Sequence, residues 1–266
     1  MTPKNILALC GVSLMLISCG EGYNSNISGG GGSTGGGSFQ VNSNGVEGVY
    51  SGMASSSGYT FWTIILPNDE LYGIYGTVHG NQLLLDGMIV GQGTMNSSGY
   101  TASVTDFPYT GPVKSGTFSA SGFSGASLDG TLTEGGTVTT FYAPSVMGSI
   151  WDYGTTFVTP ASLSSISGTW TGTLLDGMTT TVTISSTGSV TGSSSGCSFT
   201  GTAAPDSSKT NFFDVSLTFG GSPCAFPNQT ATGIGVDYLL SDNVTNQFLV
   251  AVTVGNSAGT VFAAER

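Results

Sequence analysis

Residues 211–219 read NFFDVSLTF, and this stretch shows most plainly how the chain folds. Its apolar residues Phe213, Val215, Leu217 and Phe219 occupy every second position, and Asp, Ser and Thr lie between them. An alternation with period two and one apolar side is typical of an antiparallel strand that buries one face. The stretch therefore predicts a half-buried strand in a sheet.

Much of the remaining chain follows the same rule. Similar alternations occupy 100–105 and 127–133, whereas 248–252 is apolar on both faces and is expected to lie deeper. Turn-forming residues recur roughly every eight to twelve residues, which is typical of β-sandwiches and β-barrels. We count about eight strands in 46–142 and about eight in 166–265, and eight strands close a barrel that is filled by side chains or holds one small ligand. The sequence thus predicts an all-β, antiparallel fold with two small eight-stranded barrel-like or sandwich-like halves.

A short motif marks the start of each half. VEGVYSG at 46–52 recurs as ISGTWTG at 166–172, and both follow the pattern aliphatic-x-Gly-x-aromatic-x-Gly. We therefore expect one domain at 39–145 and a second at 162–266, each with its own core, joined by a connector at 146–161. The second domain is expected to fold on its own.

The composition excludes some classes of function. Four Lys and Arg stand against 15 Asp and Glu, which gives a formal net charge of −11. Because nucleic-acid binding requires clustered basic residues, we expect no nucleic-acid partner. The 43 glycines and the low charged fraction of 7% disfavour helices, and the 38% of hydrophobic residues argue against disorder.

Residues 1–18 are predicted to be a lipoprotein signal peptide. Lys4 gives a basic start, and 6–17 is a mostly apolar run that is shorter than the ~20 residues of a membrane span. The run ends in Leu-Ile-Ser-Cys, which resembles the lipobox of bacterial lipoproteins and implies cleavage before Cys19 and lipidation of its thiol. Residues 19–38 then comprise the lipidated cysteine and a flexible Gly- and Ser-rich linker. The alternatives are an ordinary signal peptide or a short buried segment with a chance cysteine.

The mature chain resembles a group of uncharacterised outer-membrane lipoproteins of Gram-negative bacteria. The resemblance rests on the Leu-Ile-Ser-Cys box, the glycine-rich tether, ISGTWTG, GCSFTG at 196–201 and FDVSLTF at 213–219. It implies a diacylglyceryl group and an N-acyl chain such as palmitate on Cys19. Because Gly20 follows, it also implies attachment to the outer membrane, at the periplasmic or the external face. The architecture is similar to that of transferrin-binding surface lipoproteins, although none of their ligand-binding motifs is matched here.

The lipid on Cys19 is the predicted contact with the membrane. Sixteen strands would also suit a barrel that spans the outer membrane. Several segments, however, are interrupted by glycine or polar pairs before they reach the ~9–11 residues of a spanning strand. A lipid anchor would also be redundant on such a barrel, so we favour an anchored protein over a spanning one.

Cys197 and Cys224 remain once Cys10 has left with the signal peptide and Cys19 carries lipid. An even pair of cysteines in an exported chain predicts a disulfide. It would close a loop of about 28 residues and stabilise the fold by about 3–4 kcal/mol in the chain-entropy model. A metal site is the alternative, but two thiols without a nearby histidine fall short of the usual four ligands.

Few residues suggest catalysis. A serine hydrolase would need His79, the only histidine, as its base, but no Gly-x-Ser-x-Gly elbow stands out. Asp69 and Glu70 suit half of a glycosidase pair, yet adjacent acids after Pro-Asn are more simply an exposed hairpin tip. No catalytic, cofactor-binding or metal-binding residue is therefore predicted. Five aromatic residues would either line a binding face or pack in the core, namely Tyr50, Tyr59, Trp62, Tyr72 and Tyr75.

These observations predict a lipid-anchored cell-envelope protein that acts as a non-enzymatic binding or structural module. Its partner, a protein or a small molecule, is not identified by the sequence. The alternative is a cell-envelope hydrolase with an unidentified Asp, Glu or Ser site. An apolar cavity with converging acids would favour the hydrolase, and a flat aromatic patch would favour the binding module.

Overall fold

The computed structural model of the chain describes most of the residues from 46 to 266. The described ranges are 46–54, 58–79, 82–96, 99–123, 127–144, 157–240 and 244–266. The predicted signal peptide, Cys19, the linker and most of the predicted connector lie outside them. Within the described ranges, no helix is long and apolar enough to cross a membrane.

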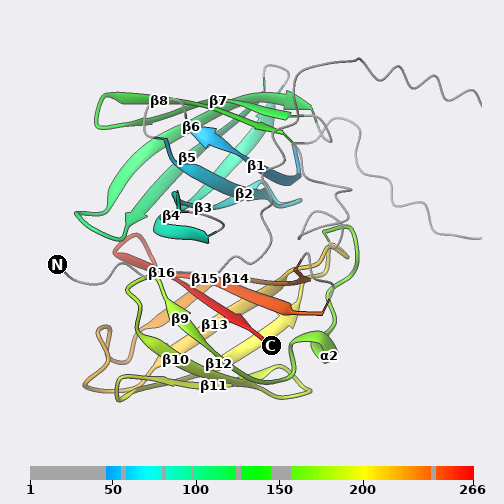
Figure 1. The fold of residues 1–266 in the computed structure, drawn as a ribbon, viewed down its shortest axis with the longest axis vertical. Coiled ribbons are helices and arrows are strands. Elements are labelled where there is room, and N and C mark those ends of the chain that lie inside the picture. The colour runs from blue at the N-terminus through cyan, green and yellow to red at the C-terminus, as the bar shows by residue number, and fades with distance from the viewer. Residues whose placement is uncertain are drawn as a thin grey trace, which may run out of the picture.

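The first eight strands form a closed antiparallel barrel (Figure 1). Each strand pairs with the next along the chain, and the last pairs with the first through Met53–Tyr142 and Ala54–Phe141. The strands are β1 (Gly48–Ala54), β2 (Thr60–Ile65), β3 (Glu70–His79), β4 (Gln82–Asn96), β5 (Gly99–Pro108), β6 (Lys114–Phe123), β7 (Ser127–Glu134) and β8 (Thr137–Pro144). We refer to this body as the first barrel.

A second closed barrel follows the short helix α2 (Leu163–Ile166). Its strands are β9 (Gly168–Leu174), β10 (Thr179–Ile184), β11 (Ser189–Ser194), β12 (Cys197–Pro205), β13 (Phe213–Phe219), β14 (Thr230–Leu239), β15 (Asn246–Val254) and β16 (Ala258–Glu265). The prediction of an all-β fold with two eight-stranded halves is confirmed. The sixteen strands close as two barrels of eight, and closure leaves no unpaired sheet edge.

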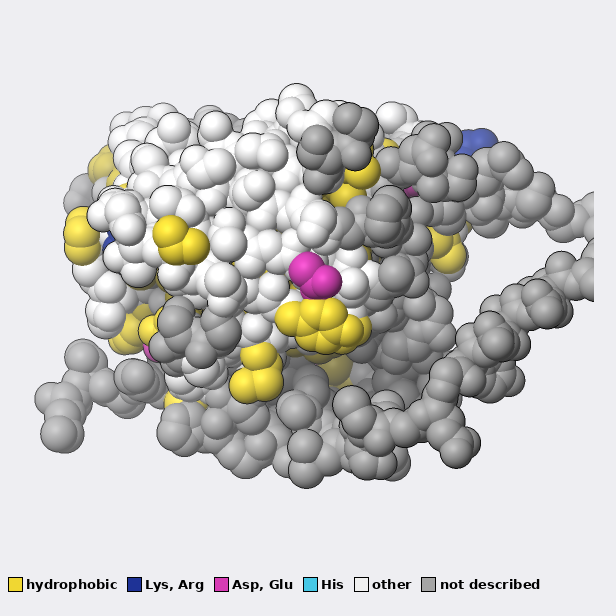
Figure 2. Space-filling view, turned by 90° about the horizontal axis from the view of Figure 1, so that it is seen from above, with side chains coloured by type: hydrophobic (Ala, Val, Ile, Leu, Met, Phe, Trp, Pro, Cys, Tyr) yellow, Lys and Arg dark blue, Asp and Glu magenta, His cyan; other side chains and the backbone are white. Residues whose placement is uncertain are grey.

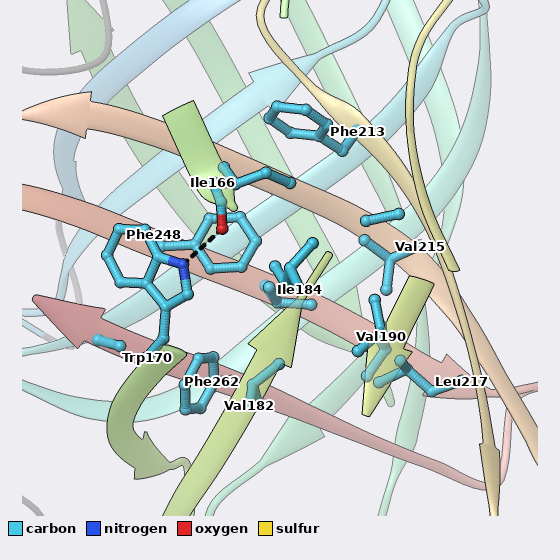
Figure 3. Close-up of a cluster of buried hydrophobic side chains, with 14 of the residues drawn as sticks. Ile166, Trp170, Val182, Ile184, Val190, Phe213, Val215, Leu217, Phe248 and Phe262 are labelled. Atoms are coloured by element: carbon cyan, nitrogen blue, oxygen red, sulfur yellow. Dashed lines mark hydrogen bonds between the residues drawn. The ribbon is translucent and has the colours of Figure 1, made fainter. Parts of the chain in front are cut away.

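Each barrel buries its inward-facing apolar side chains in a cluster of its own. In the second barrel this cluster includes Trp170, Val215, Leu217 and Phe248, and Figure 3 shows these side chains converging inside the sheet. The strand at 213–219 follows the predicted alternation, with Phe213 and Val215 buried and Asp214 exposed. The period-two pattern of the sequence therefore marks the interior correctly.

The duplicated motif has the same structural role in both barrels. The Tyr50 hydroxyl donates a 2.8 Å hydrogen bond to the carbonyl of Val46, and Trp170 Nε1 donates a 2.8 Å bond to that of Ile166 (Figure 3). Both rings are fully buried. Each aromatic residue therefore pins the segment before the first strand of its barrel, four residues back in both cases.

Arg266 covers the same end of the second barrel. Its guanidinium carbon lies 3.9 Å from the centroid of the Trp170 ring, a cation–π arrangement. The guanidinium donates hydrogen bonds to the carbonyls of Ser165 and Ser167, at 2.6 and 2.8 Å. Trp170, Arg266 and the α2 segment thus close this end of the barrel.

The outer faces of the two barrels also pack against each other. One shared apolar cluster joins Met88 and Phe107 of the first barrel to Val261 of the second. Another joins Val49, Ile64 and Leu66 to Ile234 and Tyr238, with neighbours from both barrels. In Figure 1, β4 accordingly lies over β14–β16.

This contact explains why residues 248–252 are apolar on both faces. Phe248, Val250 and Val252 belong to the interior of the second barrel. Leu249 and Ala251 pack into the cluster shared with the first barrel. The expectation that this stretch lies deeper is confirmed.

Candidate functional site

The first barrel encloses a cavity of about 700 Å³, within the range of small-molecule sites. Its lining includes residues of the β1–β2, β5–β6 and β7–β8 connections, which lie at one end of the barrel. The opposite end is closed, because Tyr50 and Tyr100 are fully buried there and the Tyr100 hydroxyl binds the carbonyl of Asp69. The cavity is therefore a cup that is entered from one side.

Asp106 lies inside this cup near its mouth. On β5 the inward residues are Tyr100, Ala102, Val104 and then Asp106, which is only 3% exposed. Its Oδ1 accepts a 2.6 Å hydrogen bond from the Tyr75 hydroxyl, and its Oδ2 lies 3.7 Å from Lys114 Nζ. A carboxylate thus occupies a position at which the strand alternation would place an apolar side chain.

Glu134 faces Asp106 from the end of β7. The two carboxyl groups share a hydrogen bond, and Oε1 of Glu134 is buried without a partner among the described residues. Burial raises the pKa of Asp106, while Tyr75 and Lys114 lower it in part. Burial and the Asp106 charge raise the pKa of Glu134. Two carboxyl groups in contact do not both ionise readily, so the pair keeps a shared proton, donated by Glu134, to higher pH than a lone carboxyl group would.

Aromatic rings form the walls beyond the carboxyl pair. The rings of Tyr59 and Tyr75 are 5.3 Å apart at the mouth. Deeper in, Phe141 packs edge-on against Phe61 at 5.5 Å and stacks on Phe118 at 4.7 Å. The cup is therefore apolar at its base and ionisable at its rim.

The second barrel holds a cavity of about 390 Å³ with a different lining. Its wall is mainly aliphatic and aromatic, with Asp176 and a few Ser and Thr side chains among the lining residues. The inward residues that form it include Val182, Ile184, Val190, Val215, Leu217, Phe248, Val250, Val252 and Phe262. This cavity suits an apolar ligand.

The predicted disulfide between Cys197 and Cys224 is confirmed, with its sulfur atoms bonded at the mouth of the second cavity. The bond fixes the loop between β13 and β14 to the start of β12. Pro223 and Phe226 of that loop line the cavity, as does Pro108 from the first barrel. Pro108 also lines the first cavity, so the β5–β6 connection lies between the two mouths.

Two of the residues considered for catalysis, Asp69 and Glu70, lie at the end of the first barrel opposite the cavity mouth. Asp69 and Glu70 form the β2–β3 hairpin at the closed end, where the Glu70 amide binds Asn68 Oδ1, as expected of a hairpin tip. His79 ends β3, and its side chain lies outside the description. Among the described residues, no group of three or more His, Cys, Asp or Glu is arranged to hold a metal ion.

The five aromatic residues divide between three locations. Tyr59 and Tyr75 line the first cavity. Trp62 and Tyr72 pack where the two barrels meet, and Tyr50 closes the first barrel. Core packing is thus confirmed for Tyr50, Trp62 and Tyr72, whereas a binding role for Tyr59 and Tyr75 stays a prediction.

Asp106, Glu134 and Lys114 were not singled out by the sequence analysis. The signal for the two acids lay in the alternation, because one more step along 100–105 and along 127–133 places Asp106 and Glu134 on the inward face. No local pattern indicates that the two strands bring these acids together.

No family model matches the chain, and no curated protein matches it. Among solved structures, the chain is similar to a protein of unknown function of the DUF3598 family from Nostoc punctiforme, with 13% identity and a TM-score of 0.26. The alignment covers 83% of this chain and 94% of that chain. Membership of the lipoprotein group expected from the sequence stays a prediction.

Proposed function

We propose that this protein is a lipid-anchored, non-enzymatic binding protein of the cell envelope that holds a small apolar molecule inside its second barrel. The observation that carries the proposal is the cavity of about 390 Å³ with its aliphatic and aromatic wall. Close packing normally fills a barrel core, so an enclosed apolar space offers a ligand the transfer energy of its buried surface. The disulfide-fixed loop at the mouth keeps the entrance preformed.

A neutral apolar probe tests this site. The full chain with Cys19→Ser, which removes the lipidation thiol, is titrated with N-phenyl-1-naphthylamine, whose fluorescence rises in apolar surroundings. Leu217→Trp fills the cavity, and Thr218→Trp places the same bulk on the exposed face of the same strand. We expect saturable binding, weakened at least tenfold by Leu217→Trp and unchanged by Thr218→Trp. Equal affinities in the two variants would contradict the site.

The anchor is the second part of the proposal. Cys19 and the Gly- and Ser-rich residues after it support a tethered protein, and the surplus of acidic residues would repel anionic lipids, so the attachment must be acyl chains. Cys19→Ser should move the chain from the membrane fraction to the soluble fraction or leave it unprocessed. Unchanged partitioning with normal processing would rule the anchor out, whatever the barrels bind.

A hydrolase is the second candidate, because Asp106 and Glu134 converge in the first cavity and converging acids in an apolar cavity are the feature expected above to favour that function. A carboxyl dyad that activates water needs free oxygens on both groups, but Tyr75 and Lys114 engage those of Asp106. Glycosidase carboxyls stand about 5 Å or more apart, whereas these two are in contact. Turnover of chromogenic glycosides or peptides that is abolished by Asp106→Asn would favour the hydrolase over the binding protein.

A further inference from the structure

The first cavity differs in charge from its surroundings. Figure 2 looks down on the first barrel, and the described part of this face is mainly white, that is, uncharged polar side chains and backbone, with isolated hydrophobic, acidic and basic side chains. Inside the cup, by contrast, Asp86, Asp106 and Glu134 line one cavity with Lys114 as the cation beside them. The rim therefore holds more acid than base.

The rim also has hydrogen-bonding capacity that the protein leaves unused. Asp106 is 3% exposed and already accepts from Tyr75, Glu134 and Lys114. The neighbouring Glu134 Oε1 is buried without a partner among the described residues. When the other oxygen of Glu134 carries the shared proton, Oε1 is a carbonyl oxygen, and when the proton leaves it is a carboxylate oxygen. It accepts hydrogen bonds in both states, so the group that completes this rim must be a donor.

A cationic donor fits better than a neutral one. The proton shared by Asp106 and Glu134 can leave when a positive group arrives, and the pair then presents a second negative charge to it. Lys114 neutralises the negative charge of the pair only in part, because its side chain is half exposed and lies 3.7 Å from the far oxygen of Asp106. The other titratable groups that line the cavity are Tyr59, Tyr75 and Asp86.

The walls suit the body of such a ligand. The faces of Tyr59 and Tyr75 stand at the mouth, where aromatic faces attract cations. Phe61, Phe118 and Phe141 form the apolar base, and a volume of about 700 Å³ admits a ring with a short side chain.

We propose that the first barrel is a second, independent ligand site, which binds the primary ammonium group of a small aromatic or aliphatic amine between Asp106 and Glu134 and the apolar body of that amine against the phenylalanine base. This site is separate from the apolar cavity of the second barrel. Either site can therefore fail its test without the other.

The probe is 2-phenylethylammonium, and its neutral counterpart is 2-phenylethanol. Both are titrated calorimetrically into the full Cys19→Ser chain near neutral pH. We expect the ammonium to bind saturably and at least tenfold more tightly than the alcohol, with protons released on binding. Equal affinities, tighter binding of the alcohol or no saturable binding of either would overturn the proposal.

Two variants locate the site. Glu134→Gln keeps the shape of the side chain but removes its charge, and should weaken ammonium binding at least tenfold and abolish proton release. Asp129→Asn changes a carboxyl on the same strand that does not line the cavity, and should leave binding unchanged. Retained N-phenyl-1-naphthylamine binding and an intact thermal melt show that Glu134→Gln is folded. Undiminished ammonium binding by this variant would overturn the proposal. If the variant does not fold, the relative affinities of the ammonium and the alcohol for the Cys19→Ser chain decide whether the proposal stands.

Discussion

The Tyr75 hydroxyl reaches across β4 to Asp106 Oδ1, at 2.6 Å, and so links two strands that do not pair with each other. Gly87 on β4 lies directly beneath this link, paired with Tyr75 on one side and with Pro108 on the other. A Cβ at residue 87 would overlap the Tyr75 ring and its hydroxyl. The position of Tyr75 at the rim of the first cavity therefore requires that residue 87 is a glycine.

Gly87→Ala should consequently disturb both stability and the rim. Overpacking of this kind costs about 1–3 kcal/mol, and displacement of Tyr75 would leave Asp106 without its phenol donor. Gly221→Ala is the matched control, because nothing lies within 4 Å of a Cβ there. Urea unfolding of the two variants should show a loss for Gly87→Ala and a change below about 0.5 kcal/mol for Gly221→Ala. Equal stabilities would show that Tyr75 is not held over residue 87.

The carboxyl pair predicts how stability depends on pH. Burial raises the pKa values of Asp106 and Glu134 in the folded protein, so between their ordinary and raised values the native state binds more protons than the unfolded chain. The stability from this pair is therefore present at low pH and is lost as pH rises through that window, from about pH 4 upward.

Glu134→Gln tests whether stability falls as pH rises through this window, because an amide cannot ionise. The free energy of unfolding, measured by urea between pH 4 and pH 8, should fall less steeply with rising pH in the variant than in the unaltered chain. At pH 8 the variant should be the more stable of the two. Parallel profiles would mean that Glu134 does not hold a proton in the folded protein.

The disulfide should stabilise the second barrel and keep its mouth in place. The half-cystines are 27 residues apart, for which the chain-entropy model gives about 3–4 kcal/mol. The double variant Cys197→Ser with Cys224→Ser should melt at a lower temperature, and reductant should lower the melt of the unaltered chain but not that of the variant. If reductant lowered both melting temperatures equally, the effect would not come from the Cys197–Cys224 disulfide.

The alternation of the sequence predicted the fold, but not how its outer faces are used. Phe213, Val215 and Leu217 point into the barrel as the pattern indicated. Val261 and Leu249 pack between barrels, and period two cannot distinguish that face from an interior one. The duplicated motif likewise marked the start of each barrel, because its aromatic residue must be buried.

The carboxyl pair escaped the sequence analysis for a different reason. Asp106 and Glu134 are 28 positions apart and belong to β5 and β7, which do not pair with each other. They meet across β6, on which Lys114 pairs with Asp106 and Gly116 pairs with Glu134, and both acids face inward. A local pattern carries no information on that contact, whereas the disulfide was predictable because few cysteines remained to pair.

The contact between barrels qualifies the expectation that residues 162–266 fold alone. Val261 is 1% exposed and packs with Met88 and Phe107 of the first barrel. Val261→Asp would bury a charge in that contact and should lower the melting temperature of the whole chain in one transition. Thr191→Asp, at an exposed site on β11, should change it little. A full chain that melts in two steps, with only one affected by Val261→Asp, would show that the barrels are independent.

The proposed function requires an apolar ligand to bind inside the second barrel. Chemical-shift mapping of Val, Leu and Ile methyl groups in the Cys19→Ser chain, during titration with N-phenyl-1-naphthylamine, tests this most directly. We expect saturable shifts at the cavity wall, with little change at the exposed Val138 and Val244. The residues expected to shift are Val182, Ile184, Val190, Val215, Leu217, Val250 and Val252. Shifts confined to exposed methyl groups, or none at saturating probe, would contradict it.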